Sequence, residues 1–319
     1  MQDSYRLPWW LQGRHAQAIY PASWMPVPAV SYRREVWQTP DDDFIELDWL
    51  MLEKPAKPDQ PLLVLFHGLE GSSQSHYAKR IMAAAGQKDW RGVVVHFRGC
   101  GGKPNLQPRS YHCGDSAEID WILKRFRRQE HGELYAAGVS LGGNVLLKWL
   151  GEQQARAGNI IGRAAAISTS LDLPVTGKVL GQGFNRLYSR IFLKTLQPKA
   201  LALIRKHRLD FDYAGIQQAD NLWDYDNLFT APLHGFQGAD DYWQQSSCRP
   251  YLRDIRLATL LINARNDPFL PAQHLPTQHE VSNQVILDFP RHGGHAGFAG
   301  TSSHDWLAER LLRFFSTDK

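Results

Sequence analysis

The sequence predicts an α/β fold in which helices cover both faces of a mostly parallel sheet. Short, continuously apolar segments recur along the chain, as expected of strands buried on both faces. Segments with helical periodicity lie between several of them, and this alternation predicts parallel strands joined by crossover helices. The expected buried strands are 62–66, 92–97, 134–139, 164–167, 258–262 and 285–289.

Two segments of alternating apolar and polar residues come before the first buried strand. They cover residues 30–38 and 44–50, and the turn residues 39–43 between them predict an antiparallel hairpin. The hairpin therefore precedes the repeating strand and helix units. Helical periodicity predicts the helices of these units at 76–85, 115–128, 144–154 and 304–315.

The stretch between the strands 164–167 and 258–262 is far longer than one crossover requires. It has helical patterns at 179–196 and 199–207. We therefore expect a single α/β domain over residues 1–319, with a mainly helical cap subdomain, 173–250, inserted between the sixth and seventh core strands. An insertion there would cover the carboxyl ends of the strands, where open α/β sheets bind ligands.

The net charge is small, but the charged residues are unevenly distributed. Lys and Arg number 36 and Asp and Glu 32, and the resulting charge of +4 does not indicate a nucleic-acid partner. No acidic residue lies between Asp172 and Asp210, and no Lys or Arg lies between Asp210 and Asp241. Because charge runs usually pair or face solvent, we expect the two blocks to pair with each other. The alternative is that the basic block, 178–208, contacts anionic lipid or substrate.

The distribution of apolar residues and cysteines indicates the cellular compartment. The N-terminal segment lacks the apolar core of a signal peptide, and no segment has the roughly 18–20 apolar residues of a membrane span. Cys100, Cys113 and Cys248 include no C-x-x-C pair. We expect reduced thiols in a cytoplasmic protein, with a Cys100–Cys113 bridge as the alternative.

The segment 138–142, with the sequence GVSLG, places Ser140 between a buried strand and a helix. A nucleophile elbow has this pattern, because a very tight strand-to-helix turn leaves no room for a Cβ atom at the flanking glycines. The turn exposes the serine hydroxyl and aims the first amides of the helix at the same point. Ser140 is therefore the candidate nucleophile.

A serine hydroxyl needs a base to remove its proton and an acid to orient that base. Asp267 lies in the loop after the strand 258–262, and both His292 and His295 lie in the glycine-rich loop after the strand 285–289. The order Ser, Asp, His, each after a strand, is that of α/β-hydrolases. We assign His295 as the base because it lies deeper in its loop, and Asp267 as the acid.

An oxyanion hole needs backbone amides from two segments. The loop after the strand 62–66 and the start of the helix after Ser140 predict the amides of Leu69 and Leu141 as its donors. A Glu70 carboxylate in the hole would repel a developing oxyanion, so we expect this side chain to turn outward or to be paired. We expect His67 to brace the loop.

Other chemistries find less support in the sequence. The cluster of Asp267, His292 and His295 lacks the spacing of metal-hydrolase signatures, and the glycines at 99–102 fit neither a dinucleotide nor a P-loop fingerprint. We therefore expect no metal and no cofactor. The aromatic residues Trp9, Trp10, Tyr20 and Trp24 are interpreted as packing, with contact at a lipid interface as the alternative.

Several segments together resemble the YheT-like branch of the α/β-hydrolases, which is related to Emb8-type and ABHD lipid-hydrolase proteins. The opening segment 6–21, RLPWWLQGRHAQAIYP, is similar to that of the same branch, so the resemblance extends over nearly the whole chain. The other segments that carry it are HGLEGS (67–72), HFRGCGG (96–102), YHCGD (111–115), GVSLGGN (138–144), NDPF (266–269) and HGGHAGF (292–298).

The resemblance implies an α/β-hydrolase fold and a serine hydrolase of the carboxylesterase kind, with Ser140, Asp267 and His295 as its triad. Relatives that act on lipid esters imply an acyl-lipid or medium-chain ester as substrate. Two alternatives remain: an acyltransferase that uses the same triad, and a non-catalytic binding protein with this fold.

Overall fold

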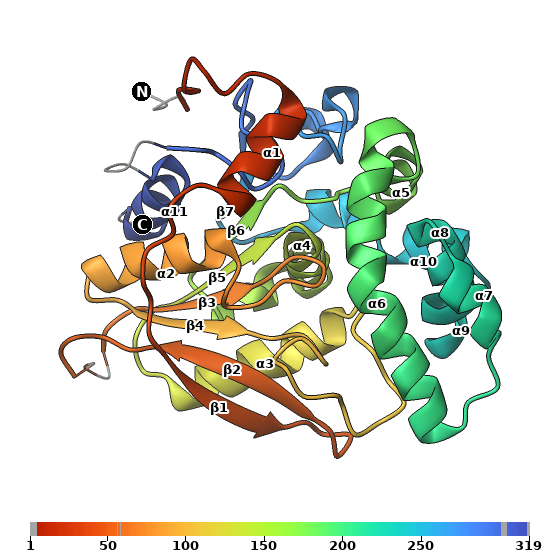
Figure 1. Ribbon diagram of the computed structural model, residues 1–319. Coiled ribbons are helices and arrows are strands. Elements are labelled where there is room, and N and C mark those ends of the chain that lie inside the picture. Colours follow the sequence, from red (N-terminus) through yellow and green to blue (C-terminus); the bar gives the residue numbers. More distant parts are fainter. Residues whose placement is uncertain (1–4, 56, 58, 301–304, 318–319) are drawn as a thin grey trace.

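A mixed β-sheet forms the centre of the protein (Figure 1), and its strands follow the order β1-β2-β4-β3-β5-β6-β7-β8. The computed structural model describes residues 5–55, 57, 59–300 and 305–317. β1 and β2 form the predicted antiparallel hairpin, β2 is antiparallel to β4, and the remaining neighbours are parallel. The strands are β1 Tyr32–Gln38, β2 Phe44–Leu50, β3 Leu62–Phe66, β4 Arg91–Val95, β5 Leu134–Val139, β6 Arg163–Ile167, β7 Thr259–Ile262 and β8 Val285–Asp288.

Helices cover both faces of this sheet because successive side chains of a buried strand point to opposite faces. In β3, Val64 and Phe66 belong to the core beneath α3 and α4, while Leu63 and Leu65 belong to the core beneath α2 and α11. The predicted α/β architecture is therefore confirmed. The bounds of these helices, with the N-terminal α1, are α1 Arg14–Ser23, α2 His76–Gln87, α3 Ser116–Gln129, α4 Leu141–Gln153 and α11 Trp306–Ser316.

Element boundaries differ from the predictions by a few residues where capping decides them. α3 begins at Ser116 because the Asp115 side chain accepts a hydrogen bond from the Glu118 amide and so acts as N-cap. α4 begins at Leu141, directly after Ser140, and not at 144. α11 begins at Trp306, and the predicted start at His304 lies outside the described residues.

The stretch between β6 and β7 is helical, as predicted, but its helices are divided differently. Its elements are α5 Leu173–Leu180, α6 Arg186–His207, α7 Tyr213–Gln218, α8 Leu222–Tyr225, a π-helical turn Asp226–Thr230, α9 Ala231–Leu233 and α10 Ala239–Ser246. These helices lie together on one side of the sheet (Figure 1), and α6 shares an apolar core with α7 and α8. Whether they act as a cap stays a prediction.

The predicted helices 179–196 and 199–207 were wrong in their boundaries. The α-helix is interrupted at residues 181–185, between α5 and α6. Gly183 in this stretch has a φ of 52°, a left-handed conformation that glycine adopts readily. Pro198, in the gap between the two predicted helices, lies inside α6. Proline costs an interior helix one backbone hydrogen bond, but buried leucines on both sides of it continue the apolar face, and this packing maintains the helix.

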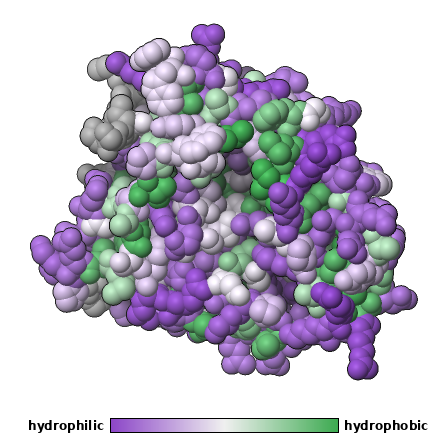
Figure 2. Space-filling view, in the orientation of Figure 1, coloured by the Kyte–Doolittle hydropathy of each residue, from purple (hydrophilic) through white to green (hydrophobic). Residues whose placement is uncertain are grey.

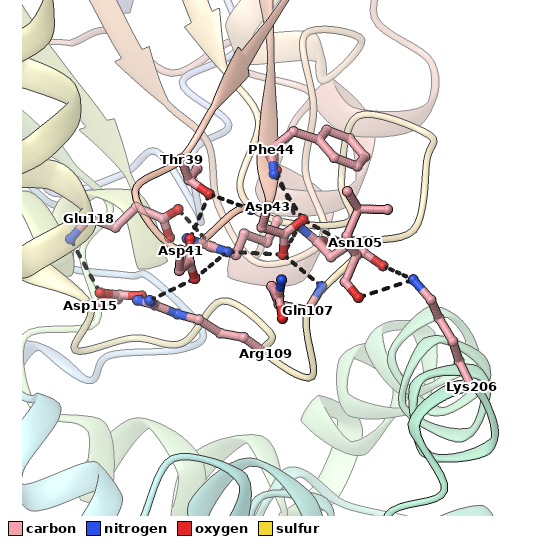
Figure 3. A network of polar contacts seen from close by, with 12 residues as sticks. Thr39, Asp41, Asp43, Phe44, Asn105, Gln107, Arg109, Asp115, Glu118 and Lys206 are labelled. Carbon is pink, nitrogen blue, oxygen red and sulfur yellow. Dashed lines mark hydrogen bonds and ion pairs between the residues drawn. The ribbon is translucent and has the colours of Figure 1, made fainter.

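A buried polar network anchors the turn of the β1–β2 hairpin (Figure 3). Asp43 accepts hydrogen bonds from the side chain of Asn105 and from the amides of Leu106 and Gln107. The Arg98 guanidinium bridges Asp43 and Glu118, at 3.0 and 2.9 Å respectively. The network therefore joins the hairpin to the loop after β4 and to α3.

Candidate active site

Ser140 lies on a strained turn between β5 and α4. Its φ of 54° and ψ of −115° lie in a region that side-chain-bearing residues rarely adopt. A Cβ on Gly142 would collide with the carbonyl oxygens of Phe66 and His67, and a Cβ on Gly138 would collide with the Gly142 backbone. The two glycines therefore make room for the turn, as the sequence predicted.

The structure brings the other two predicted residues to Ser140. The His295 Nε2 atom lies 3.0 Å from the Ser140 Oγ atom, and the His295 Nδ1 atom lies 2.9 Å from Asp267 Oδ2. Asp267 is 2% exposed, and its Oδ1 atom accepts a hydrogen bond from the Phe269 amide. His295, and not His292, is therefore the histidine within hydrogen-bonding distance of the hydroxyl.

The His295 ring is also held by apolar contact. The Phe269 ring stacks on it with centroids 4.0 Å apart and an interplanar angle of 27°. One ring nitrogen faces a carboxylate and the other a hydroxyl. This arrangement fixes the Nδ1–H tautomer and leaves Nε2 free to accept the hydroxyl proton.

Gln17 of α1 supports the loop that carries His295, and sequence reasoning missed it. Its Oε1 atom accepts hydrogen bonds from the Asn266 side chain (2.8 Å) and the Gly293 amide (3.0 Å), while its Nε2 donates to the Leu11 carbonyl. Asn266 Oδ1 in turn accepts from the Gly294 amide. Gln17 is 1% exposed. No motif singles out this residue, and its role becomes visible only when α1 is placed beside the loop.

The loop after β3 lies directly against Ser140. A Cβ on Gly68 would be 3.2 Å from the Ser140 Cβ atom, and Leu69 and Leu141 line the same cavity as Ser140. His67 braces this loop as predicted, because its Nε2 accepts from the Phe97 amide and its Nδ1 donates to the Gly68 carbonyl. Burial lowers the pKa of His67 to about 3, so the ring stays neutral in this role.

Glu70 is paired, as expected, and does not stand as a free charge beside Ser140. Its carboxylate accepts hydrogen bonds from the Tyr111 hydroxyl (2.8 Å) and from Lys199 Nζ (2.9 Å). Its own amide donates back to the Tyr111 oxygen. Since Lys199 belongs to α6, this pair connects the loop after β3 to the helical insertion.

A cavity of about 490 Å³ opens beside Ser140, within the size range of small-molecule sites. The wall near the serine is mostly apolar and comes from both the sheet and the inserted helices. Its residues include Leu69, Leu141, Leu173, Leu180, Phe192 and Phe269. The arrangement can therefore hold an apolar group against the Ser140 hydroxyl.

Comparison with known families identifies this architecture. The family described as "alpha/beta hydrolase fold" matches residues 61–299. The chain belongs to the α/β hydrolase family.

Similar proteins agree with this assignment. The α/β hydrolase described here is 37% identical over 303 residues to YheT of Escherichia coli (strain K12), which bears the name of an esterase, and the match covers 90% of this chain and 87% of that protein. It is 29% identical to the phospholipase ABHD3 of Mus musculus, over 85% of this chain and 67% of that protein. The predicted resemblance is thus confirmed, and this α/β hydrolase is an enzyme of the esterase and lipase kind.

Solved structures show the same fold at lower identity. An esterase from Exiguobacterium antarcticum superimposes on this α/β hydrolase with a TM-score of 0.56 and 14% identity, over 88% of this chain and 99% of that one. At this identity the likeness concerns the fold alone.

The three thiols of this α/β hydrolase are free. Burial raises the pKa of Cys100 and of Cys113 to about 12, so neither is a thiolate at neutral pH. The described residues contain no group of His, Cys, Asp or Glu arranged to hold a metal ion. None of the described helices is both long enough and apolar enough to cross a membrane.

The two charge blocks of this α/β hydrolase were expected to pair with each other, and for the most part they do not. Among the described residues, one ion pair joins them, between Arg186 and Asp220 at 2.5 Å. Lys199 pairs with Glu70 instead, and Lys206 donates to the carbonyls of Asn105 and Leu106. The pairing interpretation was therefore wrong for most of the basic block, because α6 turns these side chains toward the loops around the sheet or toward solvent.

Proposed function

We propose that this enzyme hydrolyses carboxylic esters through an acyl-enzyme intermediate, with Ser140, His295 and Asp267 as its catalytic triad. The observation that carries the proposal is the continuous relay from the Ser140 hydroxyl through His295 to the buried Asp267 carboxylate, with distances of 3.0 and 2.9 Å. Hydrogen-bonded contact between nucleophile, base and orienting acid is the geometry that activates a serine.

In the first step the Ser140 oxygen forms a bond to the ester carbonyl carbon, and its proton passes to His295 Nε2. Asp267 stabilises the imidazolium and keeps its orientation. The tetrahedral intermediate expels the alcohol oxygen, which takes the proton from His295. In the second step a water molecule gives a proton to His295 and attacks the acyl carbon, and the returned proton restores Ser140.

The negative charge of each tetrahedral intermediate requires donors that are already in place. We assign this role to the amides of Leu69 and Leu141, because both residues line the cavity beside Ser140. The amide of Leu141 is also at the N-terminal end of α4, where the helix dipole favours negative charge. The Glu70 carboxylate, on the residue after Leu69, is paired with Lys199.

We propose an acyl-lipid or medium-chain ester as substrate, bound with its acyl chain along the apolar wall of the cavity. Leu180, Phe192 and Phe269 supply this wall near Ser140. The match to a phospholipase agrees with such a substrate. We further propose that residues 173–250 act as a cap over this site and that the enzyme works in the cytoplasm, where its three free thiols would stay reduced.

Substitution of the nucleophile tests the proposal. Ser140→Ala should lower kcat for p-nitrophenyl esters by roughly 10⁴-fold or more, because loss of a triad serine removes the covalent pathway. A fluorophosphonate probe should label the unchanged enzyme and not the variant. Ser170→Ala, at another serine that lines the cavity, is the matched control and should retain activity. Full esterase activity in the Ser140→Ala protein would refute the triad.

Two further measurements separate the remaining alternatives: the rate of hydrolysis of esters with different acyl chain lengths, and the products formed when acyl acceptors are added. Hydrolysis should be fastest for esters whose acyl chain fills the apolar wall, and slower for acetate. If added alcohols or thiols capture most of the acyl group in place of water, the enzyme is an acyltransferase. An unlabelled protein that still binds esters would instead be a binding protein.

A further inference from the structure

Large apolar side chains are exposed on two elements outside the cavity. The segment around α1 exposes Trp9 (85%), Trp10 (49%) and Trp24 (70%). The turn before α6 and the first turns of α6 expose Phe184 (53%), Leu187 (45%) and Ile191 (51%). A soluble surface rarely gathers such side chains without a binding role. We call these six residues, with the basic residues named below, the aromatic-basic face.

The two parts of this face meet through ring contacts. His15 of α1 lies 4.4 Å from the Phe184 ring and 5.9 Å from the Tyr188 ring, measured between centroids. Beneath them, Ile19 packs against the cluster of Tyr188 and its neighbours. Figure 1 shows α1 and the α5 end of α6 at the same end of the molecule, away from the β1–β2 hairpin. The two elements that carry the exposed side chains are therefore in contact at this end of the molecule.

This surface is basic as well as apolar. Neither residues 5–34 nor residues 173–209 include an Asp or Glu. Arg14, Lys178, Arg190 and Lys194 are exposed, and none of them has an ion-pair partner in the part of the chain that the structure describes. In the same view, Figure 2 shows hydrophilic residues beside hydrophobic ones over the upper part of α6. A second copy of this chain docked through the same face would present the same positive charge and be repelled, whereas an anionic surface would be attracted.

The face also leads to the candidate active site. Tyr188 contacts Phe269 with centroids 4.9 Å apart, and Phe269 stacks on His295 at 4.0 Å. Phe269 and Phe192 line the cavity that contains Ser140. A partner bound to the aromatic-basic face would therefore lie next to the apolar wall of the cavity.

We propose that the aromatic-basic face docks on the surface of a bilayer that contains anionic lipids. Tryptophan rings favour the boundary between headgroups and acyl chains because they combine an apolar body with a polar N–H group. Leu187 and Ile191 insert at that boundary, and Arg14, Lys178, Arg190 and Lys194 contact the anionic headgroups. Nucleic acid offers the same charge but no apolar layer for the aliphatic side chains.

Vesicle sedimentation tests the electrostatic part of the proposal. The Ser140→Ala protein, which leaves the lipids intact, is mixed with vesicles of phosphatidylcholine alone or with an equal part of phosphatidylglycerol. We expect binding to the mixed vesicles that weakens as salt rises. Introducing Arg190→Gln and Lys194→Gln together into the Ser140→Ala protein should lower its partition coefficient for the mixed vesicles about 30-fold, because each basic residue near an anionic surface contributes to binding. The pair Lys88→Gln and Arg128→Gln, with the same change in net charge, should leave it nearly unchanged.

A second pair of variants tests the apolar part. Ile191 and Val36 are both 51% exposed, but Val36 belongs to the hairpin strand β1. Ile191→Asp should reduce vesicle binding at least tenfold and Val36→Asp should not. In enzyme with Ser140 intact, both should hydrolyse a water-soluble short-chain ester at the unchanged rate, which shows that they are folded. Hydrolysis of such an ester tests the proposed function by itself and does not depend on docking.

Three outcomes would overturn the docking proposal. The first is equal binding to both kinds of vesicle, or none. The second is an equal loss in the face variants and their controls. The third is tight binding to heparin or single-stranded DNA with no binding to vesicles, which would assign the face to a polyanion.

Discussion

At the scale of single residues, Gln17 illustrates how a side chain far from the chemistry can determine its geometry. The side chain accepts hydrogen bonds from Asn266, which directly precedes Asp267, and from Gly293, two residues before His295. Its own backbone lies so close to the histidine loop that a Cβ on Gly294 would approach it to 2.6 Å. We therefore expect Gln17 to be a positioning residue that acts through His295.

Removing the Gln17 side chain should slow catalysis more than it weakens substrate binding. Gln17→Ala leaves the Gly293 amide and the Asn266 amide group without their acceptor, so the histidine loop should shift. We expect kcat to fall roughly 10- to 100-fold with little change in KM, because small misplacements of catalytic groups are costly. Steady-state kinetics on a p-nitrophenyl ester measures both constants.

Two comparisons separate positioning from a general loss of stability. Gln12→Ala removes an exposed glutamine of the same segment, which bonds only to the nearby Trp9 carbonyl, and should keep full activity. Gln17→Glu retains an oxygen acceptor and should recover part of kcat. If Gln17→Ala lowers the melting temperature but leaves kcat intact at a temperature where it is folded, Gln17 has a structural role alone.

At the scale of elements, the junction of β5 and α4 depends on the absence of side chains. A Cβ on Gly142 would lie 2.6 Å from the His67 carbonyl oxygen, and backbone atoms of a buried strand end cannot move aside cheaply. We expect Gly142→Ala to destabilise the protein by about 2–4 kcal/mol, as overpacking does, and to abolish esterase activity. Urea unfolding measures the change.

Gly181 gives the matched comparison for this prediction. It has a φ of −78°, and an added Cβ would be 3.5 Å from the nearest atom, an ordinary contact. Gly181→Ala should therefore be neutral or stabilise by up to about 1 kcal/mol, since alanine restricts the unfolded chain. Equal destabilisation by the two variants would contradict the steric account of the elbow.

The link between the loop after β3 and α6 supports a second prediction at this scale. Lys199→Gln leaves the Glu70 carboxylate beside the proposed oxyanion hole without its cation. We expect kcat to fall about tenfold, because the uncompensated charge opposes the oxyanion. The double variant Glu70→Gln with Lys199→Gln should recover most of the loss, and a double-mutant cycle on kcat measures the coupling. Additive losses would show that the pair does not act electrostatically.

Local signals were sufficient for most elements and for Ser140 and the two residues that converge on it. Buried strands and the residues that follow them can be predicted because the carboxyl ends of parallel strands meet at one edge. The helix boundaries within the insertion could not be predicted, because Pro198 is tolerated inside α6 only through the packing of that helix against α7 and α8. The role of Gln17 could not be predicted for a similar reason, because its partners Asn266 and Gly293 lie more than 200 positions away in the sequence.

At the scale of the whole molecule, one polar network connects the hairpin, α3 and the insertion (Figure 3). Lys206 of α6 donates to the Asn105 carbonyl, and Asn105 bonds to Asp43 in the hairpin turn. Burial alone would raise the pKa of Asp41 in this turn, but hydrogen bonds from Arg98 and Thr39 lower it to about 2. Asp41 therefore stabilises the fold above its unfolded pKa of 3.8, and this stability is lost as the pH falls through about 2.

Glu118 in the same network should give stability the opposite dependence on pH. Burial, and next the charge of Asp115, raise its pKa to about 7, and its Oε2 atom has no hydrogen-bond partner among the described residues. Between its unfolded pKa of 4.5 and about pH 7, the folded protein holds a proton that the unfolded chain has released. Glu118 should therefore add a negative slope to the free energy of unfolding over this window, worth roughly 1–3 kcal/mol, whereas buried histidines with a lowered pKa, such as His67, add a positive one.

Replacing Glu118 with a neutral residue of the same shape should remove this slope. Glu118→Gln keeps an oxygen that can accept from Arg98 Nε but cannot ionise, so between pH 4.5 and 7 its unfolding free energy should rise relative to that of the unchanged protein by about the same 1–3 kcal/mol, because all other titrating groups are common to both. Urea unfolding at several pH values measures the effect. Glu53→Gln, on the exposed segment after β2, should leave the slope as it is. Parallel pH profiles of Glu118→Gln and the unchanged protein would mean that another group holds this proton, since the network contains several carboxylates around the Arg98 and Arg109 guanidinium groups.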